Sequence, residues 1–229
     1  MAPNRVVFLL DVDNTLLDND RIISDLMRHL ERQVGQERQR RYWAIFEALR
    51  AELGYADYLG ALQRYRAEYP HETHLMAVSS FLLNYPFANR LFPSSLDVIN
   101  QFKKWGPAVI LSDGDVVFQP HKVERSGLWE AVESNVLIYI HKELELEDVE
   151  ARYPAEHYVV LDDKLRILAA MKQSWGRRAT SVFTRQGHYA RDPEILAKYP
   201  PADLSVAGTG ELLEYDLESL VAAGKRSAA

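Results

Sequence analysis

Two pairs of aspartates each follow an apolar run, and together they could hold a divalent cation. The apolar run in RVVFLLDVDNT ends at Asp11, and Asp13 follows two positions later. The apolar run in YVVLDDK ends at Asp162 and Asp163. Such runs, cut short by a carboxylate, are typical of buried strands in a parallel sheet. Carboxylates that are crowded and poorly solvated repel one another, and a shared Mg²⁺ relieves that repulsion.

DVDNT also resembles the opening of an EF-hand calcium loop. A loop that began at Asp11 would need Gly at its sixth position and Glu at its twelfth, between two helices. This chain has Leu16 and Ile22 at those positions, and a strand-like run precedes Asp11. We therefore set the EF-hand interpretation aside.

Polar residues follow two further strand-like runs. The run AVIL ends at Ser112, and Asp113 and Gly114 follow it in SDGD, where glycine suits a tight turn. The run VLIYI is followed closely by Lys142, and Lys122 is a competing lysine on the preceding helical segment. The ordinary alternatives are a helix-capping or turn-forming serine and lysines on the protein surface.

The elements that must position these residues alternate between strand-like and helical patterns. This alternation predicts an α/β fold with a doubly wound parallel sheet, in which polar residues that end different strands converge at one edge. The strand-like runs cover residues 6–10, 108–111, 136–140, 158–161 and 180–183.

The chain between the first two strand-like runs has only helical patterns. Apolar residues recur at helical spacing in four segments, separated by Gly35, Gly54 and Pro70. We therefore predict an α/β core of residues 1–17 and 93–229 and an inserted all-helical domain of residues 18–92. The four helical segments cover residues 21–34, 38–53, 55–69 and 73–83.

The helical segment is rich in aromatic residues. We expect most of them to fill the core of this small helical domain, and one or two to face a substrate. The aromatic residues are Tyr42, Trp43, Phe46, Tyr55, Tyr58, Tyr65, Tyr69, Phe81, Tyr85 and Phe87.

Composition narrows the possible functions. A formal net charge of −6 argues against broad binding of nucleic acid or anionic membranes. The absence of cysteine excludes disulfides, thiolate zinc sites and cysteine nucleophiles. The chain enters its first strand almost at once, without an apolar signal region, and it has no run long enough to span a bilayer. We expect a cytoplasmic protein, either a monomer or a homodimer.

The motifs, in this order, resemble those of the haloacid dehalogenase superfamily of mostly magnesium-dependent phosphatases and phosphotransferases. LLDVDNTLL is similar to motif I (DxDxT), and the strand that ends in Ser112 is similar to motif II. Lys142 fits motif III better than Lys122 does, and the sequence LDD is similar to motif IV. The resemblance implies a Rossmann-like three-layer sandwich with a parallel sheet. The inserted helices resemble the C1-type cap, which closes over the active site and selects the substrate.

The resemblance also implies roles for the acidic residues. Asp11 would be the nucleophile that forms an aspartyl phosphate, and Asp13 would be the general acid and base. Mg²⁺ would be held by Asp11, by the backbone carbonyl of Asp13 and by Asp163, with Asp162 in support. Many members carry another acidic residue where this chain has Ile167, so the second half of the metal site depends on the Asp162–Asp163 pair.

The remaining motif residues would serve the phosphoryl group. Ser112 would donate to a phosphoryl oxygen, and Lys142 would balance the charge on Asp11 and on the transferred group. Thr15 would brace the motif I loop, and with Asp113 and Gly114 it would lie beside the substrate.

The expected function is a Mg²⁺-dependent phosphatase that hydrolyses a small phosphorylated metabolite. Members that displace halide usually lack the second aspartate of motif I, so Asp13 favours phosphate esters. The alternatives are a phosphotransferase or phosphomutase that uses the same aspartyl phosphate, a binding protein without turnover, and a scaffold whose acidic pairs bind metal for stability.

Overall fold

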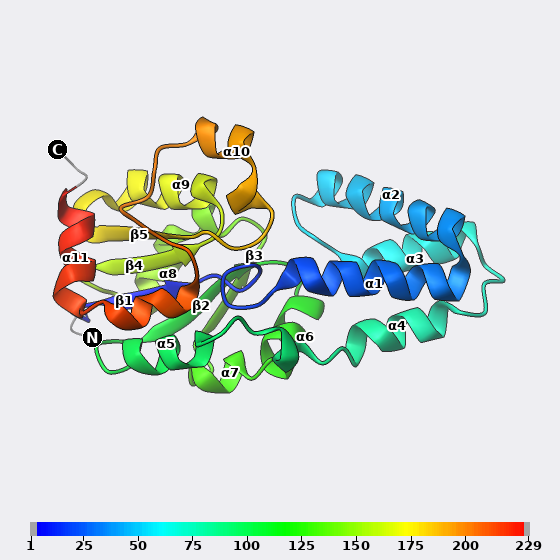
Figure 1. The fold of residues 1–229 in the computed structure, drawn as a ribbon, viewed down its shortest axis with the longest axis horizontal. Coiled ribbons are helices and arrows are strands. Elements are labelled where there is room, and N and C mark those ends of the chain that lie inside the picture. Colours follow the sequence, from blue (N-terminus) through cyan, green and yellow to red (C-terminus); the bar gives the residue numbers. More distant parts are fainter. Residues whose placement is uncertain (1–3, 227–229) are drawn as a thin grey trace.

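The computed structural model describes residues 4–226, so residues 1–3 and 227–229 of the predicted core lie outside it. Within residues 4–226, six parallel strands form one sheet in the order β3-β2-β1-β4-β5-β6 (Figure 1). The predicted α/β fold with a parallel sheet is confirmed. The strands are β1 (Val7–Leu10), β2 (Ala108–Asp113), β3 (Val136–Tyr139), β4 (Tyr158–Asp162), β5 (Ala179–Thr184) and β6 (Leu204–Val206).

Helices cover both faces of the sheet, because alternate residues of each strand point to opposite sides. On β1, Phe8 and Leu10 belong to one apolar cluster, and Val7 and Leu9 belong to the other. The first cluster includes α5 (Ser95–Phe102), α6 (Phe118–Arg125), α7 (Leu128–Ala131) and α11 (Leu217–Arg226). The second cluster includes α8 (Leu146–Arg152), α9 (Leu165–Trp175) and a residue of α10 (Pro193–Lys198).

Four helices between β1 and β2 form a helical insertion beyond the carboxyl ends of the strands (Figure 1). Asp18 caps the first helix, since its carboxylate accepts from the backbone N–H of Arg21 at 2.9 Å. Gly35 ends that helix and Gly54 ends the second, both as predicted. The insertion consists of α1 (Asn19–Val34), α2 (Gln36–Leu53), α3 (Tyr58–Glu68) and α4 (Leu75–Leu83).

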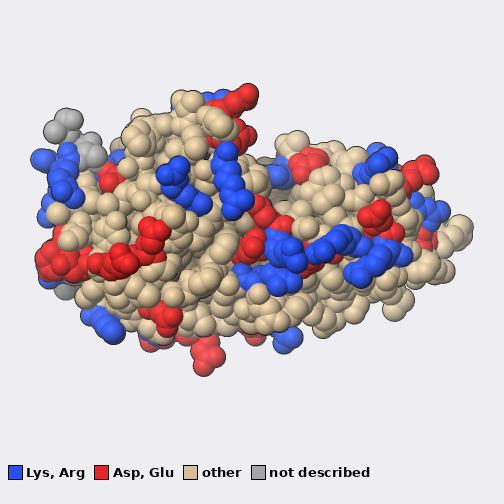
Figure 2. Space-filling model, viewed as in Figure 1, with Lys and Arg blue, Asp and Glu red and all other residues tan. Residues whose placement is uncertain are grey.

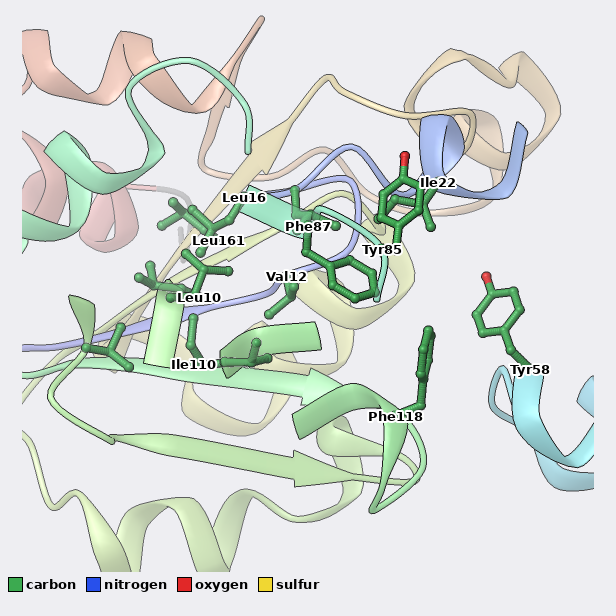
Figure 3. Packing of buried hydrophobic residues seen from close by; sticks show 14 of the residues in the cluster. Leu10, Val12, Leu16, Ile22, Tyr58, Tyr85, Phe87, Ile110, Phe118 and Leu161 are labelled. Carbon is green, nitrogen blue, oxygen red and sulfur yellow. The ribbon is translucent and has the colours of Figure 1, made fainter. Parts of the chain in front are cut away.

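The two chain segments that enter and leave the insertion are joined by hydrogen bonds. The N–H of Asp18 donates to the carbonyl of Arg90 at 2.8 Å, and the N–H of Phe92 donates to that of Leu16 at 2.9 Å. Apolar packing continues from the sheet into the insertion. Phe118, the first residue of α6, lies between the rings of Tyr58 and Phe87, which both come from the chain between β1 and β2 (Figure 3). Within residues 4–226, no helix combines the length and apolar character that crossing a membrane requires.

Candidate active site

The carboxyl edge of the sheet brings together residues that lie far apart in the sequence. Asp11 follows β1, Asp162 ends β4, and Asp163 comes directly after it. Lys142 follows β3, and Ser112 lies near the end of β2. Because β1 pairs with both β2 and β4, these strand ends are neighbours in space.

Asp11, Asp162 and Asp163 form a buried acidic trio. Each offers a carboxylate oxygen, and these oxygens lie within 4.8 Å of one another. Both oxygens of Asp163 are buried without a hydrogen-bond partner among the described residues. Burial raises the pKa of Asp163 well above its usual range, against the attraction of Lys164, and the charges of Asp162 and Asp11 add to the rise. An all-oxygen donor set with unsatisfied carboxylate oxygens fits Mg²⁺.

Lys142 neutralises part of this acidic charge. Its Nζ lies 2.5 Å from Oδ1 of Asp11 and 2.7 Å from Oδ2 of Asp162, and it donates to the carbonyl of Leu111 at 3.0 Å. Burial lowers the pKa of Lys142, but the charges of Asp11 and Asp162 raise it above its usual value overall. The side chain is therefore an ammonium ion at neutral pH.

Lys122 forms an equivalent contact with the second aspartate of motif I. Its Nζ donates to the two carboxylate oxygens of Asp13 at 2.8 and 2.9 Å, and it lies 3.3 Å from Oδ1 of Asn19. Lys122 and Lys142 are each only 1% exposed, so the alternative of a surface lysine is wrong for both. The structure thus places Lys142 beside Asp11 and Lys122 beside Asp13.

Lys122 was predicted only as the weaker candidate for the motif III lysine, although its position carried a signal for burial. The buried face of α6 includes Phe118, Lys122 and Val123. A lysine four residues after Phe118, on this apolar stripe, must have a partner for its charge. The partner could not be identified from the sequence, because Asp13 is 109 positions away.

Thr15 and Ser112 are buried, and both hydroxyls already have partners. Oγ1 of Thr15 donates to Oδ2 of Asp11 at 3.0 Å, which fixes the orientation of that carboxylate. Oγ of Ser112 accepts from Nε2 of Gln119 at 2.9 Å. Gly114 is needed for close packing, since a Cβ there would lie 2.7 Å from Cβ of Gln119.

Asp113 joins motif II to the segment that carries Lys142. Its Oδ1 accepts from the backbone N–H of Lys142 at 2.8 Å. Burial raises the pKa of Asp113, and the charge of Lys142 opposes the rise. Of the predicted site residues, Asp13, Asp113 and Asp163 line a cavity beside the acidic trio. Asp11, Ser112 and Lys142 are each at most 2% exposed.

The cavity measures about 600 Å³ and lies between the insertion and the core. Its opening lies between α2 and α10 (Figure 2). From the insertion it is lined by residues of α2 and of the turn into α3; from the core it is lined by the start of α9 and by residues 188–199. Four of the ten aromatic residues noted in the sequence line it, namely Trp43, Phe46, Tyr55 and Tyr58.

Several contacts hold the insertion against the core around the cavity. The guanidinium group of Arg50 donates to the hydroxyl of Tyr189, a residue that the sequence did not reveal. Nδ1 of His188 lies 2.7 Å from Oδ1 of Asp20, at the start of α1. Gly54 packs so closely on the core that a Cβ there would lie 2.6 Å from the ring of His141.

No protein-family model matches the chain, and no curated protein matches it. It is similar to the solved structure of a haloacid dehalogenase-like hydrolase from Burkholderia xenovorans LB400. The two are 60% identical with a TM-score of 0.90, and the similarity covers 93% of this chain and all of the other.

Two more distant structures share the fold. The hydrolase YfnB from Bacillus subtilis, solved with bound magnesium, is 16% identical with a TM-score of 0.58, over 93% of this chain and 98% of that one. An L-2-haloacid dehalogenase from Xanthobacter autotrophicus, with chloropropionic acid covalently bound, is 15% identical with a TM-score of 0.58, over 92% and 97%. The same architecture therefore occurs in a magnesium-bound hydrolase and in a dehalogenase.

Proposed function

Since the chain belongs to the haloacid dehalogenase-like hydrolases, we propose that it is a Mg²⁺-dependent phosphatase acting on a small phosphorylated metabolite. The observation that carries this proposal is the buried acidic trio, in which Asp163 has two carboxylate oxygens without a hydrogen-bond partner among the described residues. These oxygens suit a divalent cation, which the hydrolysis of an anionic ester by a carboxylate requires.

Dehalogenation is the competing reaction, because dehalogenases share this fold. Two features of the chain favour a phosphatase. Asp13 occupies the position that halide-displacing members usually leave without an aspartate. The trio of Asp11, Asp162 and Asp163 concentrates negative charge beyond what one attacking carboxylate needs, which suits a metal-dependent reaction.

In the proposed reaction, a carboxylate oxygen of Asp11 attacks phosphorus in line, and the bond from phosphorus to the leaving oxygen breaks. Asp13 gives the leaving oxygen a proton. Asp13 then takes a proton from the water that attacks the aspartyl phosphate, which releases phosphate and restores Asp11. Mg²⁺, held by Asp11, Asp163 and the Asp13 carbonyl with Asp162 in support, would neutralise negative charge during both attacks.

The neighbouring residues prepare these groups for the reaction. Lys142 and Thr15 each bind one oxygen of Asp11, so the carboxylate is oriented before the substrate arrives. Lys122 holds the carboxylate of Asp13. We propose that residues 18–92 act as the cap and residues 1–17 and 93–229 as the catalytic core, since the cavity lies between them.

Phosphate release from a panel of phosphate monoesters, with Mg²⁺ and then with chelator, tests the proposal. We expect metal-dependent turnover that Asp11→Asn abolishes. The control is Asp97→Asn, which changes a solvent-exposed carboxylate of the α/β domain and should leave turnover intact. Halide release from 2-chloropropionate without phosphate release would overturn the proposal in favour of dehalogenation. Transfer of the phosphoryl group to a second substrate, with no free phosphate, would identify a phosphotransferase.

A further inference from the structure

The part of the cavity wall contributed by the insertion is aromatic. Trp43, Phe46 and Tyr58 form a continuous stack, with ring centroids 4.8 Å apart between Trp43 and Phe46 and 4.6 Å between Phe46 and Tyr58. The rings are nearly parallel, with interplanar angles of 26° and 22°. Phe46 and Tyr58 are buried, whereas Trp43 is only half-buried. The stack therefore ends at the cavity in a flat, rigidly supported indole ring.

Trp43 packs partly against the core of the insertion, but part of its ring surface remains outside that packing. Tyr42 and Tyr65 are fully buried and fill the core of the insertion. Trp43 and Tyr55, by contrast, line the cavity and stay half-buried. Leaving large aromatic surfaces in contact with water is unfavourable, and a flat ligand ring that stacks on them removes that cost.

The core contributes a second aromatic wall. Tyr189 and Tyr199 line the cavity on this side, and both are half-buried. Tyr189 is held in place, because its hydroxyl accepts from Arg50 and Nζ of Lys164 lies 5.5 Å from its ring centroid. Aromatic side chains on the insertion and on the core can thus contact one ligand.

The cavity also has the polarity that a ring-bearing phosphate ester needs. Asp163, a member of the acidic trio, and the adjacent Lys164 line the cavity where the phosphate would react. Glu47 and Arg50 lie among the aromatic residues of the insertion and offer hydrogen bonds to ring substituents. A cavity of about 600 Å³ has the size of sites that bind ligands larger than a bare phosphate.

We propose that the substrate is a phosphate monoester whose leaving group carries a planar aromatic or heteroaromatic ring, and that this ring stacks on Trp43. This inference rests on the proposed phosphatase function. The ring can be joined to the phosphate directly, as in an aryl phosphate, or through a sugar, as in a nucleoside 5′-monophosphate.

Matched esters with and without an aromatic ring, called ring esters and ringless esters below, test the inference. Ribose 5-phosphate is a nucleoside 5′-monophosphate without its base. Glycerol phosphate is a ringless counterpart of benzyl phosphate, whose ring lies close to the phosphate and whose leaving group is likewise an alcohol, so the two differ little in leaving-group reactivity. We expect at least one ring ester to be hydrolysed with a kcat/KM at least about 10-fold above its ringless counterpart. Trp43→Ala should lower kcat/KM for that ring ester roughly 5- to 100-fold and leave the ringless ester unchanged.

Two variants separate stacking from general damage to the insertion. Trp43→Phe keeps a flat ring and should retain most of the preference. Tyr69→Ala truncates a half-buried aromatic residue of the insertion that is not among the described residues lining the cavity, and it should change neither ester. Binding of the same esters to Asp11→Asn with Mg²⁺, measured by calorimetry, should show the same dependence on Trp43 without turnover.

Two negative results differ in meaning. If some esters are hydrolysed but ring and ringless esters react equally, or if Trp43→Ala reduces both alike, the inference is wrong and the phosphatase function stands. If folded protein with Mg²⁺ releases phosphate neither from these esters nor from the panel of phosphate monoesters described above, the phosphatase function is wrong, and the assignment of a substrate is refuted with it.

Discussion

Replacing Asp163 with asparagine should stabilise the metal-free protein while removing its response to Mg²⁺. The carboxylate of Asp163 is buried without a hydrogen-bond partner among the described residues, beside Asp11 and Asp162. At pH 7 the free-energy cost of burying the charged carboxylate cannot exceed the cost of protonating it, because the group would otherwise bind a proton and become neutral. From an ordinary pKa near 3.9, that cost is about 4 kcal/mol. An uncharged asparagine amide left unsatisfied still costs about 1–3 kcal/mol.

The difference predicts that Asp163→Asn gains up to about 1–3 kcal/mol in chelator, which corresponds to at most roughly 2–12 °C in Tm for a chain of this size. Wild type should gain about 3 kcal/mol when Mg²⁺ is present at 100 times its Kd, whereas the variant should gain little. Thermal unfolding of both proteins, with chelator and with Mg²⁺, measures these shifts, and Asp97→Asn serves as the control. A variant that is less stable than wild type in chelator, or that Mg²⁺ stabilises equally, would refute the reasoning.

Three further predictions concern groups outside the acidic trio. Asp13→Asn should cost about 2–4 kcal/mol of stability in urea unfolding, since it leaves the buried Lys122 charge unpaired, and adding Lys122→Met should restore much of that loss. Burial and nearby lysines lower the pKa of His157 to about 4. Between pH 6.5 and pH 4 the unfolded state binds a proton on this histidine more readily than the folded state does. The free energy of unfolding is therefore highest above pH 6.5 and falls by at most about 3 kcal/mol as the pH drops to 4, so His157→Gln should flatten the pH dependence of Tm in that window. Gly54→Ala should cost about 1–2 kcal/mol, because φ is +83° and the new Cβ would strike His141; equal stability would contradict the packing described.

The sequence predicted the features that depend on local pattern. The strands that lead to Asp11, Ser112 and Asp162 each contain a short apolar run that a polar residue interrupts, and this signal lies within one segment. The helices of the insertion were predictable for the same reason, since their apolar spacing and terminal glycines are local. Lys142 was predicted at the site by its place after a strand.

Features that depend on contacts between distant segments could not be predicted. The hydroxyl of Ser112 accepts a hydrogen bond from Gln119, and the ammonium group of Lys122 forms an ion pair with Asp13, which lies 109 positions earlier in the sequence. Part of the core wall of the cavity, including Tyr189, comes from the segment between β5 and α10, whose sequence has no strong periodicity. Helices α8 and α10 were missed because seven- and six-residue helices carry too few apolar repeats to be recognised.

The position of β1 in the sheet has a consequence for biosynthesis. Among the described strands, β1 is synthesised before the other five and lies in the middle of the sheet, where Leu9 pairs with Val109 on one side and Val160 on the other. The insertion helices, whose contacts are local, can form while β1 is still without partners. We therefore expect the nascent chain to expose a strongly apolar strand until β4 has been synthesised, and to depend on chaperones during that interval.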